Sequence, residues 1–421
     1  MSRTNENLFI CMEAKNVSYK KKVLKELAFN GASCCSELSF RIGKSLSFTT
    51  ELINEMIEEG LVEKSGLGLS SGGRKPLTYS LHKDAFYLVA VAVDQLITRI
   101  GILDAQLNFV QPVKELELSL IGNDKALDEL TQEIKDTISG CSALLNINQI
   151  IGIGIGMPGF VDAQKSINYS FFNNNNIGAY ISRKCQLPVF IENDSSVIAL
   201  AEYWFGKAKG ERNAMVINIG WGVGLGMIID GKLFRGDNGF AGEFSHIPLF
   251  QNGKLCSCGK TGCLETETSL NFMLSSIRKD IEAGKTSCLK PDLWSKQNHF
   301  EEKYRTFIEA AERGDSLVVQ TISDAGYNIG RGIAILIHLF NPGKIVLSGR
   351  GAAAGRLWLA PIHRAINEFC VPRLAGNTQI EVSDLCHAAD IIGAAALVIE
   401  NSNDYQFDKT NLTNTYSLTV E

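Results

Sequence analysis

The 421-residue sequence lacks the features of a secreted or membrane-spanning chain. It has no continuous apolar run of the roughly 18 residues that cross a bilayer, and its opening residues, MSRTNENLFICMEAKN, lack the apolar core of a signal peptide. Its eleven cysteines are an odd number, so they cannot all form disulfide pairs within one chain. We therefore expect a folded cytoplasmic protein with reduced thiols and no membrane insertion.

A strong net charge is also absent, but the charge is unevenly distributed. The net charge of −5 argues against a protein that binds nucleic acid along its whole length. Residues 1–83 carry 12 Lys and Arg against 9 Asp and Glu, a net charge of +3, which leaves −8 for the remainder. A nucleic-acid surface is therefore expected at the N-terminus, in a chain long enough for two to three domains.

Residues 17–81 have the pattern of a winged helix-turn-helix. A basic amphipathic helix over 17–29, the short segment SCCSELSFRIG and a helix beginning near Ser45 supply three helices. Two short strands around the tip SSGGRK then predict a wing. We assign residues 1–83 to a DNA-binding domain, and a small helical module that binds protein remains the alternative.

Eight residues of this domain are expected to contact DNA. Short hydroxyl side chains at the start of the second long helix would face base edges, while Arg and Lys would neutralise phosphates. The eight are Arg41, Lys44, Ser45, Ser47, Thr49, Thr50, Arg74 and Lys75. Glu51 adds an unfavourable negative charge in the second turn of the same helix.

Two related α/β units follow Pro76. Three strand-like runs from Phe86, an amphipathic helix and a further strand give a βββαβ order, which recurs after Asn213. This duplication predicts a two-lobed α/β body with a cleft between the lobes. We place the first lobe at 84–194 and the second at 195–387, with a C-terminal helix over 388–400 returning to the first. The polar tail over 401–421 is expected to be mobile.

The segment from His246 to Cys263 has the composition of a metal site. Three thiolates and one imidazole, from Cys256, Cys258, Cys263 and His246, supply a tetrahedral set of ligands, and glycines at 259 and 262 permit the tight turns. Four ligands leave no open coordination position, so we expect structural Zn²⁺ in a loop over 246–263. Incidental reduced cysteines are the alternative.

The run LPVFIENDSSVIALAEYWFG predicts a strand that ends at Asn193 and Asp194 and a helix that begins directly after them. An Asp at the end of a strand in a cleft can accept a proton from a hydroxyl group, and the neighbouring Asn can bond further hydroxyls. A helix N-cap is the other interpretation of the same residues.

The run AGEFSHIPLFQNGKLCSCGKTGCLE, the IEND box and GIGIGMPGFVD resemble the ROK family of repressors and sugar kinases, in its repressor branch of the N-acetylglucosamine-repressor and xylose-repressor type. The resemblance implies a winged helix joined to an actin-like, ribonuclease H-like body. It also implies that His246 uses one ring nitrogen for zinc and the other for a sugar hydroxyl. Ser245 stands where the family's box has glycine. The sugar contacts that it implies are Asn193, Asp194, Glu243, His246 and Glu265.

The phosphate-binding turns depart from those of the family's kinases. Leu96 and Ile97 replace the two glycines of the Asp-x-Gly-Gly-Thr turn, Trp221 lies between Gly220 and Gly222, and the turn Ser348–Gly351 is degenerate. We therefore expect poor ATP binding or none, and no catalytic residue. The GxGxxG match over 154–159 is discounted, because no helix begins after it.

These features predict a sugar-responsive DNA-binding repressor whose effector is a monosaccharide or its phosphate. Its partners would be operator DNA and further copies of the chain, in a homodimer or higher homo-oligomer. Sugar would close the lobes and change the spacing of two winged helices. A bifunctional ATP-dependent sugar kinase that uses Asp194 as its base is the second hypothesis, and a scaffold that binds no DNA is the third.

Overall fold

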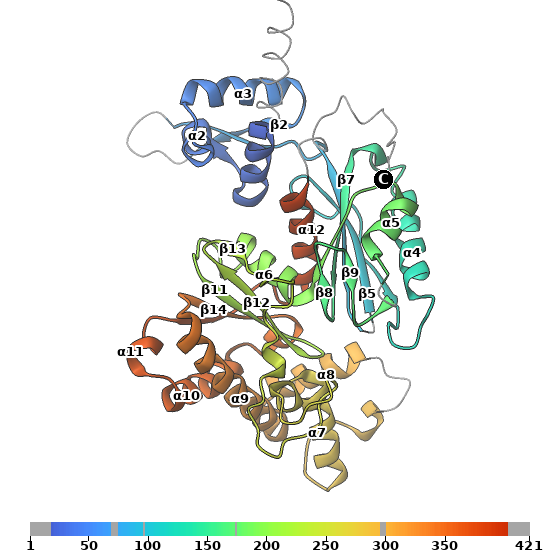
Figure 1. Ribbon diagram of the computed structural model, residues 1–421, viewed down its shortest axis with the longest axis vertical. Coiled ribbons are helices and arrows are strands. Elements are labelled where there is room, and N and C mark those ends of the chain that lie inside the picture. The colour runs from blue at the N-terminus through green and yellow to red at the C-terminus, as the bar shows by residue number, and fades with distance from the viewer. Residues whose placement is uncertain (1–17, 69–74, 96, 173–174, 295–299, 403–421) are drawn as a thin grey trace, which may run out of the picture.

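The structure, a computed structural model, describes residues 18–68, 75–95, 97–172, 175–294 and 300–402. Figure 1 shows a small N-terminal module above two α/β lobes. Within the described ranges, no helix is both long and apolar enough to cross a membrane. Most of the tail that we expected to be mobile, residues 403–421, lies outside the described residues.

The N-terminal module is consistent with the predicted winged helix, and the tip of the predicted wing, residues 69–74, lies outside the described residues. Three helices pack on an antiparallel sheet with the strand order β1-β3-β2. Each helix contributes its apolar face to the core of the module, with Leu24 from the first helix, Leu38 from the second and Ile53 from the third. Its elements are a helix over 18–30, β1 (Ser33–Cys34), α2 (Cys35–Ile42), α3 (Leu46–Glu58), β2 (Val62–Leu67) and β3 (Leu77–Leu81).

The first lobe is a five-stranded mixed sheet with the order β10-β7-β4-β5-β6. Strands β4, β5 and β6 are antiparallel neighbours, whereas β7 and β10 join in parallel. Its elements are β4 (Tyr87–Val93), β5 (Ile97–Asp104), β6 (Lys114–Glu117), α4 (Ala126–Gly140), η1 (Ile147–Gln149), β7 (Ile150–Met157), β8 (Val161–Asp162), β9 (Ile167–Asn168), α5 (Ile177–Cys185) and β10 (Val189–Asn193).

The second lobe repeats this topology, since its sheet has the order β13-β12-β11-β14-β15. The duplicated unit predicted from the sequence is therefore present. Strands and long helices of this lobe are α6 (Asp194–Phe205), β11 (Ala214–Ile219), β12 (Val223–Ile229), β13 (Lys232–Leu233), α7 (Leu270–Glu282), α8 (Phe300–Glu312), α9 (Ser316–Phe340), β14 (Lys344–Ser348), α10 (Leu359–Phe369) and β15 (Gln379–Val382). Short helices are η3 (Phe244–His246), η4 (Leu264–Glu267), η5 (Pro291–Trp294), η6 (Arg350–Trp358), α11 (Pro372–Ala375) and η7 (Cys386–Ala388).

Two helices, α6 and α12 (Ala389–Asn401), pack side by side between the lobes. Helix α6 lies on β11 and β12, and α12 lies on β4 and β7. Glycine permits this close packing, because a Cβ atom on Gly154 would lie 2.0 Å from the Ala394 carbonyl oxygen, and one on Gly393 would lie 2.0 Å from that of Val197. Gly154 thus makes room for a helix, which explains a glycine of the discounted GxGxxG match.

The module is attached to the body where α6 and α12 end, and Figure 1 shows α12 directly beneath it. Phe29 stacks on Trp204 of α6, with ring centroids 4.0 Å apart and planes 9° from parallel. The Nε1–H of Trp204 donates to Glu400 Oε1 in α12 at 2.8 Å. One buried apolar cluster contains both Leu81 of the module and Leu397 of α12. The module and the body therefore share a hydrophobic core.

Candidate functional site

A cavity of about 460 Å³ lies between the lobes. It opens where strands β4, β10, β11 and β14 end at their carboxyl termini, the edge at which open α/β sheets bind ligands. Three carboxylates, an amide and an imidazole point to a ligand rich in hydroxyl groups. The five residues expected to contact sugar all line this cavity, and they are Asn193, Asp194, Glu243, His246 and Glu265.

Asn193 is the N-cap of α6, as the alternative interpretation proposed. Its Oδ1 accepts the backbone N–H groups of Ser195 at 2.9 Å and Ser196 at 3.3 Å. Its Nδ2 donates to the carbonyl of Gly159 at 3.2 Å. One amide hydrogen of Asn193 is left for a ligand, so capping and ligand binding are compatible.

Asp194 occupies the first turn of α6 and has an unusual pKa. Burial raises the pKa of its carboxyl to about 7, the charges of Asp94 and Asp390 raise it too, and hydrogen bonds from Ser195 lower it. Its Oδ1 accepts the Ser195 backbone N–H at 2.7 Å. A carboxyl that titrates near neutral pH can either accept a hydroxyl hydrogen or hold a proton.

Glu243 and His246 form a pair on the second lobe. Glu243 Oε2 lies 3.7 Å from His246 Nε2. Burial raises the pKa of Glu243 and the charge of Glu265 raises it further, while His246 lowers it. The Nε2 edge of the imidazole therefore faces the carboxylates of the cavity.

The other edge of His246 faces three thiols, and together the four predicted ligands form one group. One ligand atom from each of His246, Cys256, Cys258 and Cys263 lies within 4.8 Å of the others. Cys256 Sγ is 3.6 Å from His246 Nδ1, and the sulfurs of Cys258 and Cys263 are also 3.6 Å apart. Zinc–sulfur bonds near 2.3 Å give tetrahedral edges of about 3.5–3.8 Å. The four side chains therefore fit a tetrahedral metal ion.

Glycine shapes the loop that brings these ligands together. Gly259 and Gly262 have φ values of 82° and 79°. A Cβ atom on Gly262 would also lie 2.1 Å from the carbonyl oxygen of Phe250. A hydrogen bond from the Lys260 backbone lowers the pKa of Cys258, which favours the thiolate form that metals bind.

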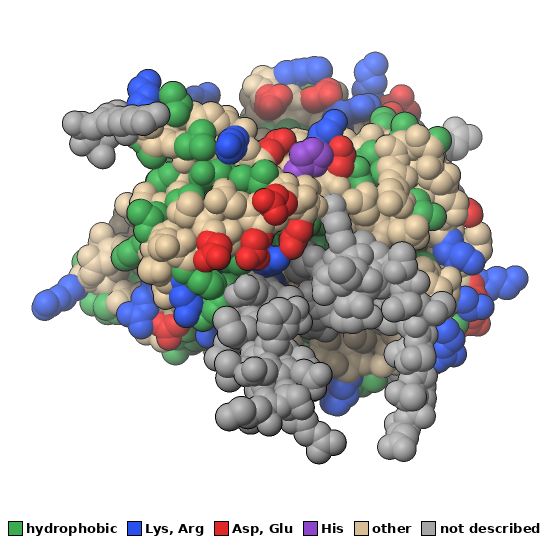
Figure 2. All heavy atoms as spheres, turned by 90° about the horizontal axis from the view of Figure 1, so that it is seen from above, with side chains coloured by type: hydrophobic (Ala, Val, Ile, Leu, Met, Phe, Trp, Pro, Cys, Tyr) green, Lys and Arg blue, Asp and Glu red, His purple; other side chains and the backbone are tan. Residues whose placement is uncertain are grey.

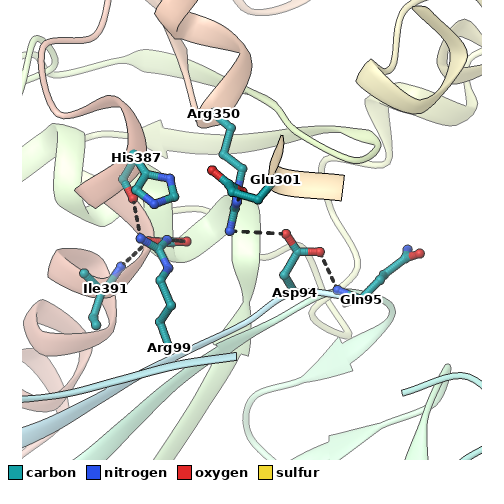
Figure 3. Close-up of polar contacts among 8 residues, drawn as sticks. Asp94, Gln95, Arg99, Glu301, Arg350, His387 and Ile391 are labelled. Atoms are coloured by element: carbon teal, nitrogen blue, oxygen red, sulfur yellow. Dashed lines mark hydrogen bonds and ion pairs between the residues drawn. The ribbon is translucent and has the colours of Figure 1, made fainter. Parts of the chain in front are cut away.

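Arg350 fills the part of the cavity beside the β4–β5 turn, and the sequence did not predict its contacts. This arginine is 8 % exposed. As Figure 3 shows, it reaches from the second lobe to Asp94 of the first, with Nη2 and Oδ2 3.7 Å apart, and it also pairs with Glu301. The guanidinium and two carboxylates thus occupy the side of the cavity next to the turn after β4, where the resemblance predicts the phosphate-binding turn.

A second buried arginine, Arg99, lies beside Arg350 and Asp94 in Figure 3. It pairs with Asp390 at the start of α12 and donates to the carbonyl of His387 at 2.8 Å. Burial lowers the pKa of His387 to about 4, and the positive charges of Arg99 and Arg350 also lower it. The imidazole of His387 is therefore neutral. One indication of this ion pair was present in the sequence, because an arginine within the otherwise apolar strand ITRIGILD needs a partner. The sequence could not identify the partner, which lies 291 residues away.

The turn Gly220–Gly222 borders the same part of the cavity. Trp221 lines the cavity, and a Cβ atom on Gly222 would lie 2.4 Å from Glu265 Oε1. Of the two residues that replace the kinase glycines, Leu96 lies outside the described residues and Ile97 begins β5.

Most of the residues expected to contact DNA are accessible. Arg41, Lys44, Ser45, Ser47 and Lys75 are exposed, Thr50 is partly buried and Arg74 lies outside the described residues. Ser45 is the N-cap of α3, because its Oγ accepts the Phe48 backbone N–H at 3.3 Å.

The assignment of Thr49 to the DNA surface was wrong. Thr49 is 0 % exposed, and its hydroxyl donates to the Ser45 carbonyl at 2.9 Å. It lies on the buried face of α3 with Leu52, Ile53 and Met56, so its side chain cannot reach a base.

The later turns of α3 are acidic. Glu51, Glu58 and Glu59 are exposed, and Lys20 pairs with Glu59 at 2.6 Å. Figure 2, which looks down on the end of the molecule that carries the module, shows acidic side chains among Lys and Arg on this face. Only the start of α3, with the hydroxyls of Ser45 and Ser47 and with Arg41 and Lys44 just before the helix, therefore has groups that suit DNA.

Together these features define a class of protein: a winged helix on a two-lobed, ribonuclease H-like body with an interlobe cavity beside a Cys₃His group. The sequence model of the ROK family matches residues 116–401, and the chain belongs to that family. The predicted resemblance and fold class are thus confirmed.

Three relatives place the chain within the family. The xylose repressor of Caldicellulosiruptor bescii is 32% identical over 390 residues, which are 91% of this chain and 95% of that protein. A glucokinase of Halalkalibacterium halodurans is 31% identical over 264 residues, 62% of this chain and 79% of that protein. The third relative is a ROK family transcriptional regulator, a homologue of the Escherichia coli MLC protein, whose crystal structure is known. Its sequence is 26% identical, the match covers 94% of this chain and 98% of that chain, and the two structures superpose with a TM-score of 0.75.

Proposed function

We propose that this chain is a sugar-responsive, DNA-binding transcriptional repressor whose kinase-like body senses a monosaccharide or a sugar phosphate. The repressor relative aligns over 91% of this chain, whereas the glucokinase aligns over 62%. The observation that carries the proposal is the packing of the sugar-cavity helix α6 directly against the winged helix. The partners are operator DNA and further copies of the chain, in a cytoplasmic homodimer or higher homo-oligomer.

In this proposal the sugar is bound by five residues of the cavity. Glu243 and Glu265 accept hydroxyl hydrogens, His246 presents Nε2, and Asn193 donates its remaining amide hydrogen. Asp194 acts as a ligand for sugar hydroxyls. All five line the same cavity, and satisfied hydrogen bonds to each hydroxyl would give selectivity.

The metal is structural Zn²⁺, held by His246, Cys256, Cys258 and Cys263. It would supply four bonds that order a loop with little apolar core of its own. His246 Nδ1 lies on the thiol side and Nε2 lies 3.7 Å from Glu243. The metal would therefore fix the orientation in which His246 meets a sugar hydroxyl.

The signal travels through α6 and α12. Both helices begin in the cavity, with Asp194 and Asp390 in their first turns, and both end beneath the module at Trp204 and Glu400. Helices of 12 and 13 residues are about 18–20 Å long. A sugar that binds one arrangement of the lobes more tightly would move these ends and the winged helix together.

DNA would be bound by the first turn of α3 and by the wing. Ser47 and Thr50 face the bases with Ser45 at the N-cap, while Arg41, Lys44, Arg74 and Lys75 neutralise phosphates. The exposed glutamates in the later turns of α3 would repel DNA phosphates. We therefore do not expect α3 to lie in the DNA groove over its full length.

A bifunctional sugar kinase is the alternative, and the pKa of Asp194 is the observation that favours it. A carboxyl with a pKa of about 7 suits a general base. Against it, Arg350, Asp94 and Glu301 occupy the phosphate side with one positive and two negative charges. Phosphates would have to displace a partly buried ion pair and would meet two carboxylates, so we propose that the chain is not an enzyme.

Two assays test the function. A coupled assay for ADP release across a panel of sugars should give no turnover, and turnover of several per second would refute the non-enzyme proposal. An electrophoretic shift with the chain's own upstream DNA at low salt should show binding that sugar weakens. Failure to bind DNA under those conditions would favour the scaffold hypothesis.

A further inference from the structure

The mouth of the sugar cavity differs chemically from its floor. The floor has carboxylates, but the mouth has aromatic side chains from both lobes. Phe160 and Tyr169, 40% and 44% exposed, flank the β8–β9 hairpin of the first lobe. Phe240, from the loop after β13, meets each of them edge-on at a centroid distance of 5.8 Å.

The backbone that carries these aromatic side chains is held by hydrogen bonds and by a nearby ion pair. The Tyr169 backbone N–H donates to the Phe160 carbonyl at 2.9 Å, and the Phe160 N–H donates to Ser170 Oγ at 2.9 Å. The loop that carries Phe240 is tied to β10 by the ion pair of Arg235 and Glu192 at 2.6 Å. A rigid aromatic surface binds a flat apolar face with little loss of conformational entropy.

A second groove of about 490 Å³ adjoins the sugar cavity and is lined by residues of the first lobe. It shares Ile121, Ser170 and Phe171 with the sugar cavity and is further lined by Tyr169 and Asn123. Among the described residues that line it, none is Lys, Arg or His, and the one carboxylate is that of Asp124, so nothing there attracts an anion such as a sugar phosphate. The groove therefore suits an uncharged ligand with apolar faces and hydroxyl edges, which a sugar ring has.

We propose that the effector is a neutral oligosaccharide: one ring lies on the carboxylate floor, and the next ring leaves the cavity over Phe160, Tyr169 and Phe240 into the outer groove. This proposal rests on the proposed sugar-binding function and extends its ligand from a single sugar ring to a chain of two or more neutral rings. Because Phe240 belongs to one lobe and Tyr169 to the other, an oligosaccharide would touch both lobes, which a single ring on the floor need not do.

The test is isothermal titration calorimetry of the full chain with two matched series: xylose, xylobiose and xylotriose, and glucose, cellobiose and cellotriose. In one series the disaccharide should bind on the order of tenfold more tightly than its monosaccharide, the increment of an aromatic stacking contact. Tyr169→Ala and Phe240→Ala should remove that increment and leave monosaccharide affinity within about twofold.

Two controls separate the possible failures. Glu243→Ala should weaken every member of the series, and Phe234→Ala, which removes a 41% exposed aromatic that lines neither cavity nor groove, should change none. Tight monosaccharide binding with no gain for the disaccharide would overturn the oligosaccharide proposal alone. A gain that survives both aromatic substitutions would overturn the groove. No binding of any sugar in either series would overturn this proposal, whereas the proposed function, which also admits a sugar phosphate, fails only if no sugar changes DNA binding.

Discussion

Replacing Trp204 with Ala tests the connection between the sugar cavity and the winged helix. The substitution removes the stack on Phe29 at 4.0 Å and the hydrogen bond to Glu400 at 2.8 Å. Trp204 lies at the far end of α6 from Asp194, so the cavity itself loses no group. Sugar affinity should therefore stay close to the wild-type value.

The size of the effect follows from these two contacts. An aromatic stack contributes about 0.5–1.5 kcal/mol beyond its buried area, and a hydrogen bond to a charged group about 1.5 kcal/mol or more. Allowing for the partial exposure of Trp204, docking should weaken by about 2 kcal/mol, a factor of roughly 30. Allosteric coupling typically amounts to about 1–3 kcal/mol, so this loss should remove most of the response to sugar.

The assay is fluorescence anisotropy with labelled upstream DNA, titrated with and without saturating sugar. The ratio of the two dissociation constants should fall toward one in Trp204→Ala. Trp204→Phe, which keeps an aromatic ring on Phe29 but lacks the Nε1–H, should retain part of the response. A full wild-type ratio in Trp204→Ala, with the protein folded, would refute the route through α6.

Three further substitutions test the cavity and the metal group. Cys258→Ser should release zinc and lower both thermal stability and sugar affinity, because His246 loses its fixed orientation; unchanged metal content by elemental analysis would refute the ligand set. Glu243→Ala should weaken sugar binding by tenfold or more with little loss of stability, and wild-type affinity by calorimetry would remove it from the site. Because burial raises the pKa of Asp194 to about 7, the folded state holds a proton between pH 4 and 7 that the unfolded state has lost. The free energy of unfolding should therefore fall as pH rises through that window, and Asp194→Asn should lack this fall; equal slopes in urea titrations would contradict the shift.

The two-lobed fold was predictable because its signals are local and repeated. The βββαβ order occurs twice, and each occurrence specifies the same sheet order. The metal group was predictable because three of its ligands lie within eight residues of sequence, where glycine turns must bring them together.

The error at Thr49 came from treating the start of a helix as exposed throughout. Thr49 lies three, four and seven residues before Leu52, Ile53 and Met56, which is the spacing of one helical face. That pattern was present in the sequence, and it places the Thr49 side chain in the core.

The ion-pair network and the module–body contact were not predictable, because they join residues far apart in the chain. Arg99 pairs with Asp390, and Phe29 stacks on Trp204. One sequence shows that a charge or a ring is available but not which partner the folded chain brings to it. The roles of the cavity residues in binding sugar remain predictions for the same reason.

The most direct test of the central claim is DNA affinity measured as a function of sugar concentration, without ATP, for the wild-type chain and for Glu243→Ala. We predict that the effective sugar weakens wild-type DNA binding at least fivefold with no nucleotide present, and that Glu243→Ala binds DNA normally but needs far more sugar for the same effect. DNA binding that is unchanged by every sugar that calorimetry shows to bind the cavity would contradict the claim.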